Sequence, residues 1–281
     1  MKNKLFAFVA SVMLFTSFNM YSCTGFRDKV RGSGNVKIEM RNLTGFSEIQ
    51  TRSSVDVKVR QGETFEVKVE ADDNLIQYIS TEVEGNVLVV DIKEDINIRD
   101  NNKMLVYVTM PVVKALSARG SGNIIGEGKF TGETIEVATM GSGNLSLSFD
   151  GKGIDAKTKG SGNIDLSGNI VVVQCEINSS GNIEASLECV SMDLSVHGSG
   201  NMNIKGKTDD FKARVHGSGN IDCYNLITQK ADIAIQGSGN CNINVTEHLN
   251  ASVEGSGNID YDGNPAKVVS RIKGSGKISK R

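Results

Sequence analysis

The amino-acid sequence predicts an all-β fold: a single-stranded β-solenoid, built as a right-handed β-helix with coils of about 19 residues. The main observation is a repeat, since the motif Gly-Ser-Gly-Asn, or a close variant, begins at residues 120, 141, 160, 179, 198, 217, 237, 255 and 274. A fixed period near 20 residues is typical of a solenoid. The composition agrees, because 31 glycines, only 2 prolines and no tryptophan among 281 residues suit a regular stack of tight turns.

Apolar and polar residues alternate on both sides of each motif, which is the pattern of a strand with one buried face. The residue after the Asn is apolar in every repeat: Ile124, Leu145, Ile164, Ile183, Met202, Ile221, Cys241, Ile259 and Ile278. Because the coils of a solenoid stack about 4.8 Å apart, we expect this row to form a buried ladder. A β-sandwich and a β-propeller are the competing folds, but a propeller blade needs about 40 residues and a recurrent aromatic residue.

The motif itself indicates a corner of the coil. Its third residue is Gly in all nine repeats, whereas its first is Gly in eight and Ser179 in the other. Glycine in a strand is entropically costly, so we expect the third position to need a positive φ or a close backbone approach. The first position is expected to need only a small residue. Asn fills the fourth position except at Lys277, and stacked Asn amides can form a hydrogen-bonded ladder.

A binding role for the Ser and Asn rows is the alternative interpretation of the motif. Calcium-binding β-rolls place Asp at fixed positions in nine-residue repeats. The repeats of this chain are about 19 residues long, and their polar residue is the neutral Asn. Glycine-rich phosphate loops precede a helix, whereas these loops precede strands. The sequence therefore favours a structural role for the motif.

The chain begins with a predicted lipoprotein signal peptide at residues 1–22, with Lys2 and Lys4 followed by an apolar run from Leu5 to Phe18. This run is too short to cross a bilayer as a permanent helix. The end of the signal resembles a bacterial lipobox, which implies cleavage before Cys23 and acylation of Cys23. Met20 and Tyr21 depart from the usual lipobox residues, so ordinary cleavage near Ser22 is the alternative. A lipid-anchored protein of the cell envelope, at the outer membrane and facing the periplasm or the surface, is expected.

We divide the rest of the chain into a tether at 23–34, a strand-rich segment at 35–115 and the repeat β-helix at 116–281. Within the second part, alternation predicts strands at 55–59, 65–69, 87–92 and 105–110. A short helix is expected at 73–79, with Asp72 or Asp73 as its cap. These strands are expected to form the first coils of the same solenoid, and a separate small β domain is the alternative.

The side chains that could carry chemistry form no complete site. His197 and His216 occupy the same repeat position and should stack about 5 Å apart, but a good metal site needs more ligands. Asp165, Asp222 and Asp260 share one row, which Glu184, Asn203 and Asn242 interrupt. The pairs Asp72-Asp73 and Asp209-Asp210 are expected in turns. We therefore predict a non-catalytic protein without a cofactor or a metal.

The cysteines after Cys23 are Cys175, Cys189, Cys223 and Cys241. Cys175 and Cys241 fall on inward rows. Cys223 is offset by two residues from Cys241 in the adjacent coil, which places their Cα atoms about 8 Å apart, beyond the disulfide limit of about 7 Å. We expect buried free thiols.

The Gly-Ser-Gly-Asn repeats, preceded by a strand-rich segment and a lipoprotein signal, resemble the family of auto-transporter adhesins with the head GIN domain over residues 35–278. The resemblance implies a secreted or surface-tethered β-helical protein for adhesion or scaffolding. The expected partners are the membrane, through the lipid on Cys23, and a protein or glycan; the net charge of −2 gives no reason to expect nucleic acid. A carbohydrate-binding or carbohydrate-active β-helix is the alternative function.

Overall fold

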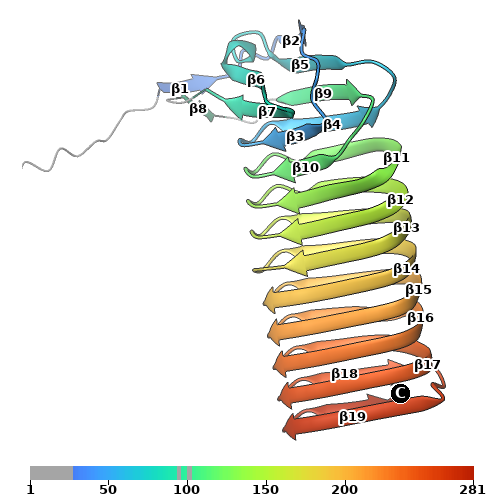
Figure 1. Cartoon of the computed structure of the whole chain (residues 1–281). Coiled ribbons are helices and arrows are strands. Elements are labelled where there is room, and N and C mark those ends of the chain that lie inside the picture. Colours follow the sequence, from blue (N-terminus) through green and yellow to red (C-terminus); the bar gives the residue numbers. More distant parts are fainter. Residues whose placement is uncertain (1–27, 94–95, 100–102) are drawn as a thin grey trace, which may run out of the picture.

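The computed structural model describes residues 28–93, 96–99 and 103–281, so the predicted signal peptide and Cys23 lie outside the described residues. The predicted fold is confirmed: the chain is an all-β solenoid of about nine turns with coils of about 19 residues. Figure 1 shows these coils stacked into a rod, with the N-terminal strands at one end and the C terminus at the other. Within the described part, no helix is long and apolar enough to cross a membrane.

Each repeat forms a long strand that runs around most of one coil and pairs in parallel with the next coil. These strands are β11 (Ile124–Thr139), β12 (Leu145–Thr158), β13 (Asn163–Ile177), β14 (Asn182–Gly198), β15 (Asn201–Gly217), β16 (Asn220–Gly237) and β17 (Asn240–Gly255). The last complete coil contains β18 (Asn258–Asp262) and β19 (Lys267–Gly274), and β20 (Lys277–Lys280) begins the next coil by pairing in parallel with β18. Because neighbouring coils are shifted by one repeat, equivalent residues of all repeats stack along the rod.

The row after the Asn forms the predicted buried ladder. Strand pairing joins its nine members in order from Ile124 to Ile278. All are buried except Ile278 in the last coil, which is half-buried. The interior also contains Phe130 and Phe149, which stack in register between the first two repeat coils.

Two rungs of the N-terminal segment extend the same stack. Strands β3 (Glu48–Thr51) and β4 (Asp56–Gln61) pair in parallel with β10 (Ala115–Ala118) and β11. On the other side of that rung, β7 (Val87–Ile92) pairs with β3, and β9 (Leu105–Met110) pairs with β4. The stacking order therefore differs from the chain order, because the rung of β3 and β4 lies between the rung of β7 and β9 and the first repeat.

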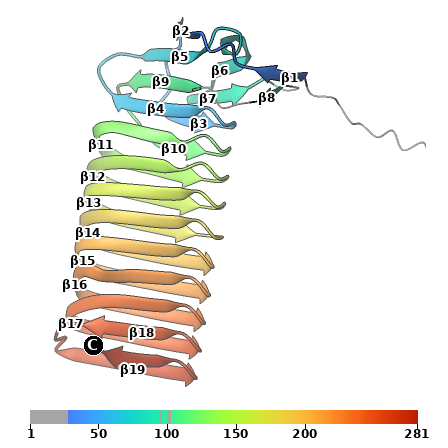
Figure 2. The same ribbon diagram turned by 180° about the vertical axis from the view of Figure 1, so that it is seen from behind.

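Antiparallel strands close this end of the rod and form, with the two rungs, what we call the cap (residues 28–110). Strand β5 (Glu66–Asp72) pairs antiparallel with both β9 and β2 (Val36–Arg41), and β6 (Ile79–Glu84) pairs antiparallel with β7. The inward side chains of β5, including Val67 and Val69, are fully buried and cover the solenoid interior. Strands β1 (Asp28–Arg31) and β8 (Ile96–Arg99) form a separate two-stranded sheet at the side of the cap, as Figure 2 shows from behind.

The helix expected at 73–79 is only a 3-10 turn, η1 (Ile76–Tyr78), and the prediction of an Asp cap is wrong. Leu75 occupies the N-cap position of η1 without a side-chain hydrogen bond. The residue that follows η1, Ile79, already belongs to β6. The two aspartates instead accept hydrogen bonds from the isolated Gly-Ser-Gly-Asn segment at 32–35. Asp73 accepts from the Ser33 hydroxyl at 2.5 Å and the Asn35 amide at 2.9 Å, and Asp72 accepts from the Gly34 N–H at 3.1 Å.

The third-position glycines are required for close stacking, as expected, but the expectation that the first position needs only a small residue is wrong. A Cβ atom on any third-position glycine would lie 2.0–2.3 Å from a carbonyl oxygen of the preceding coil. None of these glycines has a positive φ. The first position has it instead, at 127–132° for the glycines at 198, 217, 237, 255 and 274. The first glycines at 120, 141 and 160 do not adopt it, so Ser179 lies where the corner changes geometry and is no precedent for later coils.

We predict that both Gly198→Ser and Gly200→Val destabilise the rod, whereas Ser199→Ala does not. At Gly198 the φ is 130° and a Cβ would lie 2.6 Å from the Ser179 oxygen, which should cost about 1–3 kcal/mol. At Gly200 a Cβ would lie 2.1 Å from the Gly181 oxygen, so Val should cost about 3 kcal/mol or more. Urea unfolding of the three variants beside the parent measures this, and a Gly198→Ser midpoint equal to that of Ser199→Ala would contradict it.

Candidate functional site

The Asn residues of the motif form a continuous hydrogen-bonded ladder along the rod. In each coil the Asn side-chain amide, and in nearly every coil the backbone N–H as well, donates to the Oδ1 atom of the Asn in the preceding coil. The distances are 2.8–3.3 Å, and the ladder joins Asn123, Asn144, Asn163, Asn182, Asn201, Asn220, Asn240 and Asn258. The predicted Asn ladder therefore exists, and these amides are used within the fold.

Opposite charges stand at the two ends of the Asn ladder. All its donors point toward the cap, where the Asp56 carboxylate accepts from the backbone N–H and side-chain amide of Asn123 at 2.8 and 2.9 Å. At the other end, Lys277 pairs in register with Asn258. Aligned amide dipoles leave partial positive charge at their donor end and partial negative charge at their acceptor end. Asp56 and Lys277 thus complement the ladder's dipole.

The two histidines stack as predicted. The rings of His197 and His216 are 4.9 Å apart and nearly parallel, with an interplanar angle of 16°. The only side-chain hydrogen-bond contact of this pair within the described part is that of His197 Nε2 with the Ser195 hydroxyl, at 3.0 Å. No group of three potential metal-ligating His, Cys, Asp or Glu side chains occurs among residues 28–93, 96–99 and 103–281.

The predicted aspartate row is in register but does not bring its three aspartates together. Asp165 pairs with Glu184, and Asn242 separates Asp222 from Asp260. The prediction that Asp209 and Asp210 lie in a turn is wrong, because both belong to β15, whose strand continues around the corner of the coil.

The four cysteines are free thiols, as predicted, and three of them are fully buried. Cys223 pairs with Ile243 and Cys241 with Ile221, which is the expected offset of two residues. Burial raises the pKa of the Cys175 and Cys241 thiols to about 12. The half-buried Cys189 also has a pKa raised by burial, so all four resist ionisation and behave as small apolar side chains.

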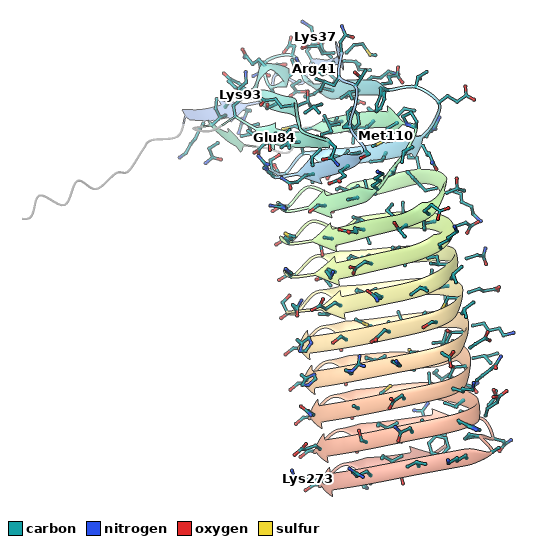
Figure 3. The ribbon with its side chains drawn as sticks, viewed as in Figure 1. Lys37, Arg41, Glu84, Lys93, Met110 and Lys273 are labelled. Carbon is teal, nitrogen blue, oxygen red and sulfur yellow. The ribbon has the colours of Figure 1, made fainter. Side chains whose placement is uncertain are left out.

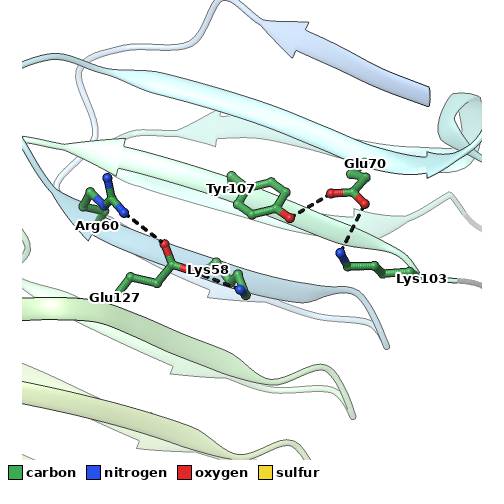
Figure 4. A network of polar contacts seen from close by, with 6 residues as sticks. All are labelled: Lys58, Arg60, Glu70, Lys103, Tyr107 and Glu127. Atoms are coloured by element: carbon green, nitrogen blue, oxygen red, sulfur yellow. Dashed lines mark hydrogen bonds and ion pairs between the residues drawn. The ribbon is translucent and has the colours of Figure 1, made fainter. Parts of the chain in front are cut away.

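A polar network on the cap, shown in Figure 4, was not expected from the sequence. Glu70 accepts hydrogen bonds from the Tyr107 hydroxyl at 2.8 Å and from Lys103 at 3.2 Å. These two contacts, the one from Tyr107 foremost, hold the pKa of Glu70 below its usual value. On β11, Glu127 forms ion pairs with Lys58 at 3.0 Å and with Arg60 at 3.6 Å.

All of this network except Lys103 lines a groove of about 370 Å³, in which Glu66, Glu70 and Glu127 balance the charges of Lys58, Arg60 and Lys68. It joins β4, β5, β9 and the first repeat strand β11, so it ties the cap to the rod. The sequence signal was the alternation of charged and apolar residues in these strands, which marks an outward face without showing which charges meet.

A second groove, of about 600 Å³, lies on the rod itself and crosses β14 to β17 and β19. We call it the long-face groove, and its polar lining consists of Ser191, Asp210, Lys212, Lys230, Asp232, His248, Asn250 and Lys267. Asp232 accepts a hydrogen bond from Asn250 at 2.9 Å. Lys212, Lys230 and Lys267 form no ion pair with any described residue, although Lys230 pairs in register with Asp210 and Lys212 with Asp232.

Comparison with known proteins gives one family. The family described as "Putative auto-transporter adhesin, head GIN domain" matches residues 45–187 and 172–265. Among curated proteins, no significant match was found.

Solved structures of similar proteins cover most of the chain. A putative adhesin from Parabacteroides merdae is 22% identical with a TM-score of 0.68, covering 90% of this chain and 99% of its own. A putative lipid binding protein from Parabacteroides distasonis is 27% identical with a TM-score of 0.68, covering 90% of this chain and 100% of its own. A putative adhesin from the same species is 22% identical with a TM-score of 0.64 and the same coverage.

We predict that Asp56 anchors the Asn ladder. Asp56→Ala removes the acceptor of two hydrogen bonds and should lower the free energy of unfolding by about 1–3 kcal/mol. Asp56→Asn keeps an Oδ1 acceptor and should cost less. Asp165→Ala, which removes an exposed carboxylate without a hydrogen bond to any described residue, is the control. Equal urea midpoints for Asp56→Ala and Asp165→Ala would show that the carboxylate has no such role.

Proposed function

Because the chain belongs to the family of putative auto-transporter adhesins with the head GIN domain, we propose that it is a non-catalytic adhesin or scaffolding protein, anchored in the cell envelope by lipid on Cys23. The observation that carries the proposal is the position of the long-face groove, which lies in the coils near the end of the rod opposite the cap. Cys23, the proposed anchor, precedes the cap in the sequence.

The short spacing between Cys23 and the first strand supports this arrangement. Only residues 24–27 separate Cys23 from β1, and four extended residues span at most about 14 Å. An acylated Cys23 would therefore hold the cap close to the membrane. The stacked coils, coupled through parallel pairing and the Asn ladder, would project the long-face groove away from it.

The long-face groove is the proposed binding surface because its lysines are exposed and form no ion pair with the described residues. A partner with carboxylate, sulfate or phosphate groups would complement them, whether it is a protein or a glycan. Sugar-binding sites often have exposed aromatic rings, but the aromatic residue at this groove, Phe211, is buried. A charged surface of a protein or an acidic glycan is thus favoured over a neutral sugar.

We predict that Cys23→Ser releases the protein from membranes into the soluble fraction. Several acyl chains on one cysteine give stable anchoring, since each buried methylene contributes about 0.8 kcal/mol. Fractionation and fatty-acid labelling of both proteins measure this. Wild-type protein that incorporates no fatty acid would remove the lipid anchor from the proposal.

We also predict that the long-face groove carries the adhesive binding. The protein would be screened against a glycan array and a panel of purified cell-surface proteins, and the affinity of each binder measured. Lys212→Glu with Lys230→Glu should weaken binding about tenfold or more by reversing two charges. Lys205→Glu with Lys207→Glu changes two exposed lysines of β15 outside the groove and should leave the affinity unchanged. Equal losses in the two double variants would place the binding surface elsewhere.

A further inference from the structure

The end of the rod opposite the cap has an unpaired strand edge. Strand β19 is 8 residues long and, among the described residues, pairs only with β17 of the preceding coil. Figure 3 shows its residue Lys273 at this end of the rod. The backbone N–H and C=O groups on the other side of β19 have no strand partner within the described part. Such an edge is a template onto which another extended chain can add.

The apolar interior of the solenoid is open along the same strand. Val268 and Ile272 stand in register with Leu249 and Val253, which are 1% and 2% exposed. Val268 and Ile272 are 41% and 48% exposed, because no described strand stacks on them. At the cap end, by contrast, the inward side chains of β5 cover the interior. One further strand on β19 would bury these two side chains as each preceding coil is buried by the next.

Strand β19 also lacks an inward-pointing charge, which is a common protection of edge strands. Its charged residues stand in register with outward residues of β17; they are Lys267, Arg271 and Lys273. They therefore leave the interior uncovered. Strand β20 differs, because Lys280 follows Ile243 and Tyr261 on an inward row. The edge of β20 thus carries such a charge, and the edge of β19 remains open.

The charges of the last two layers of the rod are segregated by sign. Residues 240–262 contain no lysine or arginine, and their carboxylates are those of Glu247, Glu254, Asp260 and Asp262. Residues 267–281 contain no aspartate or glutamate, and their basic residues are Lys267, Arg271, Lys273, Lys277, Lys280 and Arg281. The basic layer rests on the acidic one, and Lys273 forms an ion pair with Glu254. Lys267 and Arg271 form no ion pair with the described residues, so a layer added beyond them is complementary if it is acidic.

We propose that β19 takes an acidic, extended segment of a partner protein as an added strand. The backbone of that segment pairs with the open edge, and its inward apolar side chains cover Val268 and Ile272. Its outward carboxylates face Lys267 and Arg271. The bare edge favours a polypeptide over a glycan or a lipid, because only a strand presents backbone donors and acceptors at the matching spacing.

A second copy of this chain is a poorer occupant of the edge. Pairing of the same end of two copies brings cations together, because neither β19 nor β20 contains an acidic residue. At the cap of a second copy, the strand β2 pairs only with β5 among the described residues. Its single carboxylate, that of Glu39, already forms an ion pair with Arg41. Neither end of a second copy therefore supplies free carboxylates to Lys267 and Arg271.

The open edge is a different site from the long-face groove. Arg271 and Ile272 lie outside that groove, whereas Lys267 and Val269 belong to its lining. An added strand would extend the groove by one layer at its end. The edge has its own hydrogen-bonding groups and apolar side chains, so the proposal does not depend on what the groove binds.

Binding of short labelled peptides to the full chain with Cys23→Ser, measured by fluorescence polarisation, tests the added strand. The first peptide alternates valine and threonine with glutamate, and the second has lysine in place of each glutamate. The third is the glutamate peptide with methylated backbone amides, which cannot donate hydrogen bonds. We expect the glutamate peptide to bind, and the other two to bind about tenfold more weakly or less.

A charge reversal on β19 is the second arm of the test. Arg271→Glu should weaken binding of the glutamate peptide about fivefold or more and strengthen binding of the lysine peptide. The matched control is Lys205→Glu, which reverses an exposed lysine of β15 outside the long-face groove and should bind both peptides like the parent. Circular dichroism verifies that each variant is folded, and the comparison of the three peptides on the parent depends on no variant.

Failure of the glutamate peptide to bind the parent would overturn the proposal, and so would equal binding of the methylated peptide. Equal effects of Arg271→Glu and Lys205→Glu would also contradict it. A loss in the Lys212/Lys230 variant without a loss in Arg271→Glu would place the peptide in the long-face groove instead. Sedimentation equilibrium examines the other occupant, since a dimer of the parent that the glutamate peptide dissociates would assign the edge to a second copy.

Discussion

The close approach of successive coils at the Gly-Ser-Gly-Asn corner is the constraint on which the rest of the structure depends. In a typical coil, the second and third backbone N–H groups of the motif both donate to the carbonyl of the first motif residue in the preceding coil, as Ser199 and Gly200 do to Ser179 at 3.1 and 3.0 Å. A side chain at the third position would clash with the carbonyl oxygen of the third motif residue in the preceding coil, as a Cβ on Gly200 would with Gly181. This contact fixes the register, and the register in turn places the buried ladder, the Asn ladder and the outward rows of charge.

The rod has a direction because its two ends are built differently. The Asn ladder begins at Asp56, so the cap provides the acceptor from which all the amide donors continue. Antiparallel β5 covers the interior at that end, and the network of Glu70 and Glu127 ties the cap strands to each other and to β11. The proposed anchor lies at the cap end, while the long-face groove lies toward the other end. A rod with two different ends suits a protein that attaches to a surface at one end and binds a partner near the other.

Those parts of the structure that repeat could be predicted from the sequence, and those that occur once could not. The ladder from Ile124 to Ile278, the Asn ladder and the stacked histidines follow from a fixed period, which converts spacing in sequence into distance in space. The positive φ of the first glycine was missed because Ser179 suggested tolerance, although the corner changes geometry in that coil. The cap network and the contacts of Asp72 and Asp73 join residues far apart in the chain, such as Lys58 with Glu127, and no periodic signal marks them. The long-face groove was missed for a related reason, since its three lysines lie on two rows, where Asp210, Asp232 and His248 interrupt them.

Amide hydrogen exchange at the corners is the most direct test of the central claim. If close backbone stacking at the motif holds the rod together, the N–H groups of the second and third motif residues are protected as strongly as those of the adjoining strands. Protection should be greatest in the middle coils and fall toward the last coil, because each coil is stabilised by its neighbours. Corner amides that exchange as fast as those of a solvent-exposed loop, while the strands stay protected, would contradict the account.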